Sequence, residues 1–165
     1  MKEKKKRLVA PRGFLFASGE AGLRTHGGGP DVGLIYSTAR AKVGALFTAN
    51  RVKAAPVLIC QEFLTRSHNV AQAIVVNAGN ANCATGAHGI RAARQCSQTA
   101  AGLLGLRPEG VLVASTGVIG VPLDASRITS LLPGLVRQLH PEGYDAVSRA
   151  ILTTDTHSKV ASRSL

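Results

Sequence analysis

Two short apolar runs that end abruptly in loops of very small residues constrain the fold more than any other feature. The run AIVVN (73–77) passes into AGNANCATG, and the run VLVAS (111–115) passes into TGVIG. An apolar run of this length that stops at turn residues is typical of a buried strand feeding a loop. Between the two, from about Ala87 to Leu106, apolar residues recur at helical spacing. The order strand, helix, strand favours packed layers of sheet and helix over a helical bundle.

The composition suits such layers. The chain has 165 residues, enough for one domain with a sizeable core, and 45% of them are hydrophobic although only 4% are aromatic. The core must therefore consist of Val, Ile, Leu and Ala, the usual filling of α/β layers. We expect a layered sandwich of the α+β or α/β class.

Several further strands and helices are expected around this central unit. Strands are predicted at 8–16, 32–37, 43–48 and 56–60, with a glycine-rich connection at 19–30 and a hairpin turn over 38–42. Pro56 suits the first residue of a strand. A helix is predicted from Asp124 or Ser126 to about His140, kinked or split by Pro133, and a last helix over 143–152.

The charge is strongly positive, with a net charge of +11 from 20 Lys+Arg and 9 Asp+Glu. Such a balance attracts nucleic acid or an anionic membrane, and it equally fits a solvated basic surface or an acidic partner. The densest basic run lies within residues 1–10, which we expect to form a flexible tail. No aromatic-rich strand offers a stacking platform for bases, so a basic RNA-associated protein is the weaker interpretation and we expect no nucleic-acid partner.

Membrane and metal sites find no support in the sequence. Pro11, Arg12 and Gly13 interrupt the first apolar stretch, and no later run approaches the ~20 residues that span a bilayer. The three cysteines, Cys60, Cys83 and Cys96, have no metal-type spacing. We expect a cytoplasmic protein with reduced thiols, no membrane contact and no metal site.

Three loops of small polar residues could carry chemistry: 77–86, 115–120 and 153–156. Their residues tolerate left-handed backbone, and their N–H groups and hydroxyls can stabilise developing negative charge. Each loop is equally compatible with a plain turn between a strand and a helix. Phosphate-binding, dinucleotide-binding, nucleophile-elbow and zinc-protease motifs are absent, and the five histidines are scattered. Any chemistry would therefore use backbone dipoles and hydroxyls, with a nucleophile from elsewhere.

Five segments in order resemble the signature blocks of one family. They are GFLFASGEAGLR (13–24), FTANRVKAAPV (47–57), VVNAGNANCATG (75–86), ASTGVIG (114–120) and AILTTDTHSK (150–159). These blocks are similar in order and spacing to those of the bifunctional ornithine acetyltransferases of arginine biosynthesis, also called glutamate N-acetyltransferases, the ArgJ family. The resemblance covers the chain from about Pro11 to Lys159.

This resemblance implies a mechanism. Family members are precursors that cut themselves before a threonine, which becomes the N-terminal nucleophile of a β chain and uses its own α-amine as base. The threonine takes acetyl from N-acetylornithine, and glutamate then accepts it; some members also use acetyl-CoA. The resemblance implies no cofactor, no metal, and an α2β2 heterotetramer of α and β chains.

The resemblance also assigns residues. Thr116 and Gly117 would form the oxyanion hole. Thr153, and with it Thr154, would bind substrate. A site-shaping loop would comprise Asn77, Gly79, Asn80 and Asn82.

One family block has no counterpart here. The cleavage block, a Lys-Gly-x-Gly-Met-Ile stretch leading to the threonine, is not found, so residues 11–165 are expected to be an α-chain portion truncated before the autocleavage site, with the nucleophile absent. Such a piece should be inactive alone and incomplete as a fold without the β chain, leaving apolar surface uncovered. A fragment, a truncated gene and half of a split enzyme stay open. So does a non-catalytic α/β module that binds a small anion.

Overall fold

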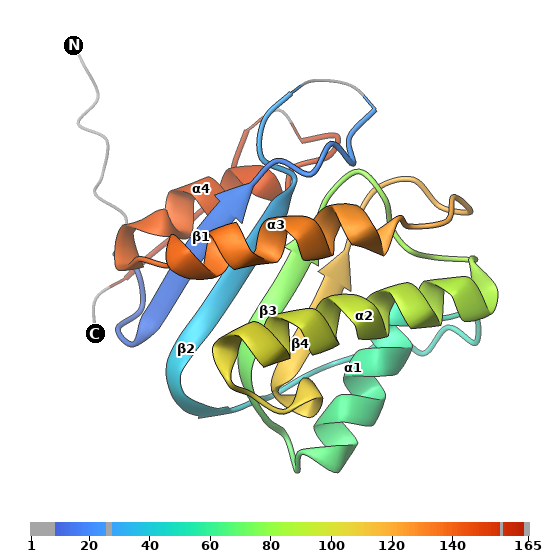
Figure 1. Ribbon diagram of the computed structural model, residues 1–165, viewed down its shortest axis with the longest axis horizontal. Coiled ribbons are helices and arrows are strands. Elements are labelled where there is room, and N and C mark those ends of the chain that lie inside the picture. The colour runs from blue at the N-terminus through green and yellow to red at the C-terminus, as the bar shows by residue number, and fades with distance from the viewer. Residues whose placement is uncertain (1–8, 26–27, 156, 164–165) are drawn as a thin grey trace.

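A four-stranded mixed sheet organises the molecule. The computed structural model describes residues 9–25, 28–155 and 157–163, so most of the expected tail at 1–10 lies outside the described residues. The sheet has the order β1 (Phe14–Gly19), β2 (Val32–Lys42), β3 (Val70–Asn77) and β4 (Val111–Ser115) (Figure 1). The pairs β1–β2 and β2–β3 are antiparallel, and β4 runs parallel to β3.

Three helices cover one face of this sheet. Helices α1 (Ala55–Arg66), α2 (Gly86–Leu104) and α3 (Ala125–Arg137) pack over the strands, with α2 and α3 crossing in front of the sheet in Figure 1. The core between them is aliphatic, as the composition requires: Leu34, Val75 and Val113 lie side by side on three paired strands. Alanines on α2 let this helix approach the sheet closely, because a methyl group occupies little depth.

The short helix α4 (Tyr144–Ala150) lies on the opposite face. Gly19 and its partner Val32 face α3, since a Cβ on Gly19 would meet Leu131 and Leu135. The next residue, Gly33, must face the other way, and a Cβ there would lie 2.9 Å from Val147 of α4. Two 3₁₀ turns, Pro108–Gly110 and Pro141–Gly143, precede β4 and α4.

The central prediction is confirmed and several boundaries are corrected. The strands at 73–77 and 111–115 and the helix between them are present, although the helix ends at Leu104, before the predicted Leu106, with Gly105 as a left-handed C-cap. The strand expected at 8–16 begins later, at Phe14, and continues to Gly19 as β1. Helix α3 begins at an N-cap, where the Asp124 side chain accepts the Ser126 N–H, and it continues through Pro133 without splitting. The last helix forms within 143–152, as α4.

Two strand predictions are wrong. The hairpin of 32–37 and 43–48 is instead one long strand, because β2 continues past a bulge and pairs Ala41 and Lys42 with β3. The segment 43–48 pairs with no strand among the described residues and is mostly exposed. The expected strand at 56–60 belongs to α1, where Pro56 occupies the first turn, a position that lacks an intrahelical N–H partner in any case.

Burial of Cys96 predicts an alkaline loss of stability. Desolvation raises the pKa of the Cys96 thiol from 9.0 to about 12. The unfolded chain therefore loses this proton from about pH 9 upward while the folded chain keeps it, and stability falls by about 1.4 kcal/mol per pH unit until the folded thiol ionises. Urea unfolding between pH 8 and 10.5 should show a steeper fall for the native chain than for Cys96→Ala. Equal slopes would contradict this account.

Candidate functional site

The carboxyl ends of the parallel strands β3 and β4 lie side by side and carry two of the predicted loops. Beyond β3 and β4 the backbone contact continues: the Thr116 N–H donates to Asn77 (2.9 Å), the Val118 N–H to Gly79 (3.2 Å), and the Ala81 N–H to Val118 (2.9 Å). The Ser115 hydroxyl adds a 2.6 Å bond to Asn77 Oδ1. The two loops therefore form one hydrogen-bonded unit that extends the sheet past its last residues.

Two glycines let the backbones in this unit touch. Gly117 has a φ of +134°, and a Cβ there would lie 2.3 Å from the carbonyl carbon of Gly79. Gly79 has a φ of +96°, and its Cβ would lie 2.5 Å from the carbonyl oxygen of Leu23. Because real Cβ atoms do not approach that closely, only glycine fits at either position. Three chain segments, around residues 23, 79 and 117, are thus stacked backbone against backbone.

A buried aspartate holds the outermost of these segments. Asp31 is 1% exposed. Its carboxylate accepts the N–H groups of Ala21 (2.6 Å), Leu23 (2.5 Å) and Arg24 (3.4 Å). Buried carboxylates need such donors, and here the donors all come from one loop, which the carboxylate fixes in place. Sequence reasoning missed Asp31, although an aspartate directly before a strand and after a glycine run was the available signal.

The three asparagines brace the loop after β3. Asn77 Nδ2 donates to the carbonyl of Asn80 (2.8 Å), and Asn80 Nδ2 donates to the carbonyl of Val121 (3.0 Å). Asn82 Nδ2 donates to Gly89 at the start of α2 (2.9 Å). All three side chains are buried, with exposures of 7% or less, so their amides order the backbone. This agrees with a site-shaping role, which stays a prediction.

A pocket of about 450 Å³ brings the other predicted residues together. It is lined by Arg24, Thr25, Gly79, Thr116, Gly117, Val118, Thr153 and Thr154. The residues come from four separate parts of the chain, and the two predicted pairs, Thr116–Gly117 and Thr153–Thr154, share this cavity. Arg24 and Thr25 also line the pocket, and neither was predicted as a site residue.

Two hydrogen-bond donors of the residues that line this pocket have no acceptor among the described residues. Among the described residues, neither the Gly117 N–H nor the Thr116 hydroxyl donates to a protein acceptor, whereas the Thr116 and Val118 N–H groups on either side of Gly117 are bonded. Donors held by a rigid backbone but left free can stabilise an oxyanion without reorganisation. The arrangement can therefore bind a carbonyl oxygen on which negative charge develops.

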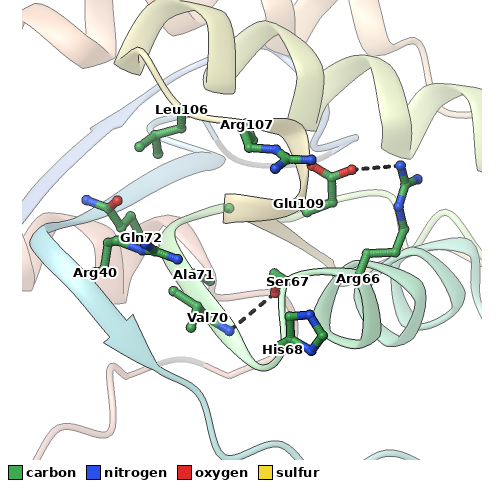
Figure 2. Close-up of a pocket in the computed structure, with 11 residues that line it drawn as sticks. Arg40, Arg66, Ser67, His68, Val70, Ala71, Gln72, Leu106, Arg107 and Glu109 are labelled. Carbon is green, nitrogen blue, oxygen red and sulfur yellow. Dashed lines mark hydrogen bonds and ion pairs between the residues drawn. The ribbon is translucent and has the colours of Figure 1, made fainter.

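A second pocket, of about 320 Å³, lies at the opposite end of β3 and β4. Figure 2 shows Arg40 and Gln72 on one side of it and the buried Glu109 on the other, paired with Arg66 at 2.9 Å. No predicted site residue lines it. We therefore place the candidate site at the carboxyl ends of the strands.

Residues 9–25, 28–155 and 157–163 match neither the features of a metal site nor those of a membrane-spanning helix. There, no group of three or more histidine, cysteine, aspartate or glutamate side chains could hold a metal ion. Within the same ranges, no helix combines the length and apolar character that crossing a bilayer requires.

Curated proteins named arginine biosynthesis bifunctional protein ArgJ are similar in sequence to this chain. The arginine biosynthesis bifunctional protein ArgJ of Syntrophotalea carbinolica is 43% identical over 156 residues, which are 94% of this chain and 39% of that protein. The ArgJ protein of Geobacter sulfurreducens is 44% identical and covers 92% of this chain and 38% of its own length. The chain spans about two fifths of the length of these relatives.

Solved structures share the fold. The ArgJ protein of Bacillus halodurans superposes with a TM-score of 0.81 at 34% identity, covering 88% of this chain and 75% of that one. An ornithine acetyltransferase of Mycobacterium tuberculosis, complexed with ornithine, gives a TM-score of 0.84 at 31% identity, with coverages of 92% and 83%. These superpositions confirm the layered α+β fold. A model of the ArgJ family matches residues 15–165, and the chain belongs to that family.

Proposed function

We propose that this chain is the α-chain part of an acetyltransferase of arginine biosynthesis that moves acetyl from N-acetylornithine to glutamate. Thr116 and Gly117 form its oxyanion hole, and Thr153 with Thr154 binds substrate. The observation that carries the proposal is one pocket lined by Thr116, Gly117, Thr153 and Thr154, in which the Gly117 N–H and the Thr116 hydroxyl have no acceptor among the described residues.

The proposed reaction has two halves. A threonine hydroxyl attacks the acetyl carbonyl of N-acetylornithine, its proton passes to a base, and charge develops on the carbonyl oxygen. The Gly117 N–H and the Thr116 hydroxyl stabilise that oxygen. Collapse of the tetrahedral intermediate then breaks the C–N bond and releases ornithine, whose amine takes up the proton held by the base. The amine of glutamate then attacks the acetyl-threonine ester and restores the hydroxyl. Acetyl-CoA is a possible alternative donor, and the proposal needs no cofactor.

The nucleophile is proposed to come from a β chain of the same precursor. The unequal coverages support this: this chain spans 39% of a curated ArgJ protein but 83% of a solved ornithine acetyltransferase chain. A heterotetramer of two α and two β chains in the cytoplasm is the assembly that we propose.

An open sheet face supports a partner chain as well. Ile35, Ile74 and Leu112 lie across β2, β3 and β4 on the face that carries α4, and they line a cavity of about 260 Å³. Ile74 is 36% exposed. On this side, within the described residues, α4 packs mainly on β1 and β2. Contiguous apolar surface of this kind is a common site of chain association, and we assign it to the β chain.

The experiment that tests the proposal compares this chain alone with the chain co-produced with a family β chain that begins at its threonine. We expect acetyl transfer from N-acetylornithine to glutamate only when the two chains are produced together. Binding of N-acetylornithine without turnover in the assembled pair would instead favour a non-catalytic small-anion module.

Thr116→Val in this pair is expected to lower kcat by about 10²–10³, the usual effect of losing one oxyanion donor. The folded state should be unaffected, because the Thr116 hydroxyl has no protein acceptor among the described residues. Thr116→Ser keeps the hydroxyl and should retain most of the activity. Equal turnover by Thr116→Val and the native pair would remove Thr116 from the oxyanion hole.

A further inference from the structure

Arg24 connects two parts of the candidate site that are far apart in the sequence. It lies in the loop after β1, where its own N–H contacts the Asp31 carboxylate. Its Nη2 crosses to the end of α4 and donates to the carbonyls of Arg149 (3.1 Å) and Ala150 (2.9 Å). One end of Arg24 is thus fixed by Asp31, and the other holds the last turn of α4.

The Arg24 guanidinium contacts α4 at its C-terminal end. The last carbonyls of a helix have no intrahelical donor, and a cation near them is favourable. The Arg149 carbonyl also accepts the Leu152 N–H (3.2 Å), so the guanidinium supports the turn that leads into Thr153. Within the described chain, neither Thr153 nor Thr154 makes a hydrogen bond or ion pair of its own. Their placement therefore depends on the residues that precede them.

The charge of Arg24 is not used for an ion pair. Among the described residues, no carboxylate lies within 4 Å of its guanidinium, and its Nε is buried without a hydrogen-bond partner. A half-buried cation with an unsatisfied donor is unfavourable by itself. Arg24 also lines the 450 Å³ pocket together with both threonine pairs. A role in the site gives a reason for a side chain whose Nε stays buried without a partner.

We infer that Arg24 is a positioning residue: it clamps the end of α4 and so holds Thr153 and Thr154 opposite Thr116 and Gly117. The inference rests on the proposed function, because it takes Thr153 and Thr154 as substrate-binding residues. Arg24 itself need not touch the substrate. Its effect should appear as weaker substrate binding, since the oxyanion donors are anchored separately through β3 and β4.

The kinetic test uses Arg24→Met in the assembled pair. Methionine keeps an unbranched chain but cannot donate to a carbonyl. We expect KM for N-acetylornithine to rise about tenfold with kcat within about twofold, the signature of lost uniform binding. Arg24→Lys should recover most of the loss, because an ammonium can still donate to one carbonyl. Arg149→Met, which removes a guanidinium from the same helix end but leaves its carbonyl, should leave KM unchanged.

A double-mutant cycle separates positioning from general destabilisation. If Arg24 acts through Thr153, then Arg24→Met should change KM less than twofold in a Thr153→Ala background, against about tenfold in the native background. Additive effects would overturn the inference, and so would a fall in kcat at constant KM.

Hydrogen exchange provides a readout that does not depend on activity. In this chain alone, Arg24→Met should accelerate exchange of the Ile151 and Leu152 amides, which donate to the last turn of α4, while the amides of β3 and β4 keep their protection. If the native pair shows no acetyl transfer, the proposed function fails, but this measurement still tests whether Arg24 holds the end of α4. Unchanged exchange at Ile151 and Leu152 would overturn the inference.

Discussion

Gly117→Ala is expected to reduce acetyl transfer by the assembled pair at least ~10²-fold, the cost of displacing a reacting group's partner by about 1 Å. The added Cβ would lie 2.3 Å from the Gly79 carbonyl carbon and 2.6 Å from the Asn80 nitrogen. Both are backbone atoms, so the two loops must separate. Separation would lengthen the bond from the Val118 N–H to Gly79 and move the Gly117 N–H away from the position of an oxyanion.

Gly120→Ala is the matched control for this variant. Gly120 lies in the same loop and also has a positive φ, +83°, but a Cβ there meets nothing within 4 Å. Its expected cost is therefore the backbone strain alone, about 1 kcal/mol of stability, with turnover largely retained. Initial rates and urea unfolding of both variants measure the two effects. Similar activities for Gly117→Ala and Gly120→Ala would contradict the steric account.

The elements that carry the site were predictable because local and tertiary signals agree there. Alternate residues of the runs at 73–77 and 111–115 are buried on the parallel strands, and α2 has an apolar stripe against them. The error at 56–60 has a different origin. Four apolar residues after a proline fit a strand, but the buried positions Ala55, Ile59 and Phe63 are four apart and belong to a helix longer than that window.

The site itself was accessible from the sequence only in pieces. The loops at 115–120 and 153–156 stood out through their composition, yet nothing in periodicity brings Thr116 to the same pocket as Thr153. That proximity arises from α4 returning over β1 and β2, on the face away from the other helices. Arg24 and Asp31 escaped notice because their partners are backbone groups, which leave no residue pattern.

Asp31→Ala is expected to cost this chain at least ~3 kcal/mol of unfolding free energy, because three N–H groups lose their acceptor at about 1 kcal/mol or more each. The Asp31 carboxylate orders the segment at 21–24, and Leu23 of that segment is the surface against which Gly79 packs. Loss of the carboxylate should therefore loosen Gly79, then Gly117, and free Arg24 from its anchor.

Urea unfolding measures the stability of Asp31→Ala, and the assembled pair measures its activity. Asp31→Asn keeps one acceptor oxygen and should lie between the native chain and Asp31→Ala. Glu20→Ala removes an exposed carboxylate from the same connection and should change stability by less than ~0.5 kcal/mol. If Asp31→Ala unfolds at the same urea concentration as Glu20→Ala, the stack of three segments does not depend on this carboxylate. If it is destabilised but fully active, the stack supports the fold and not the pocket.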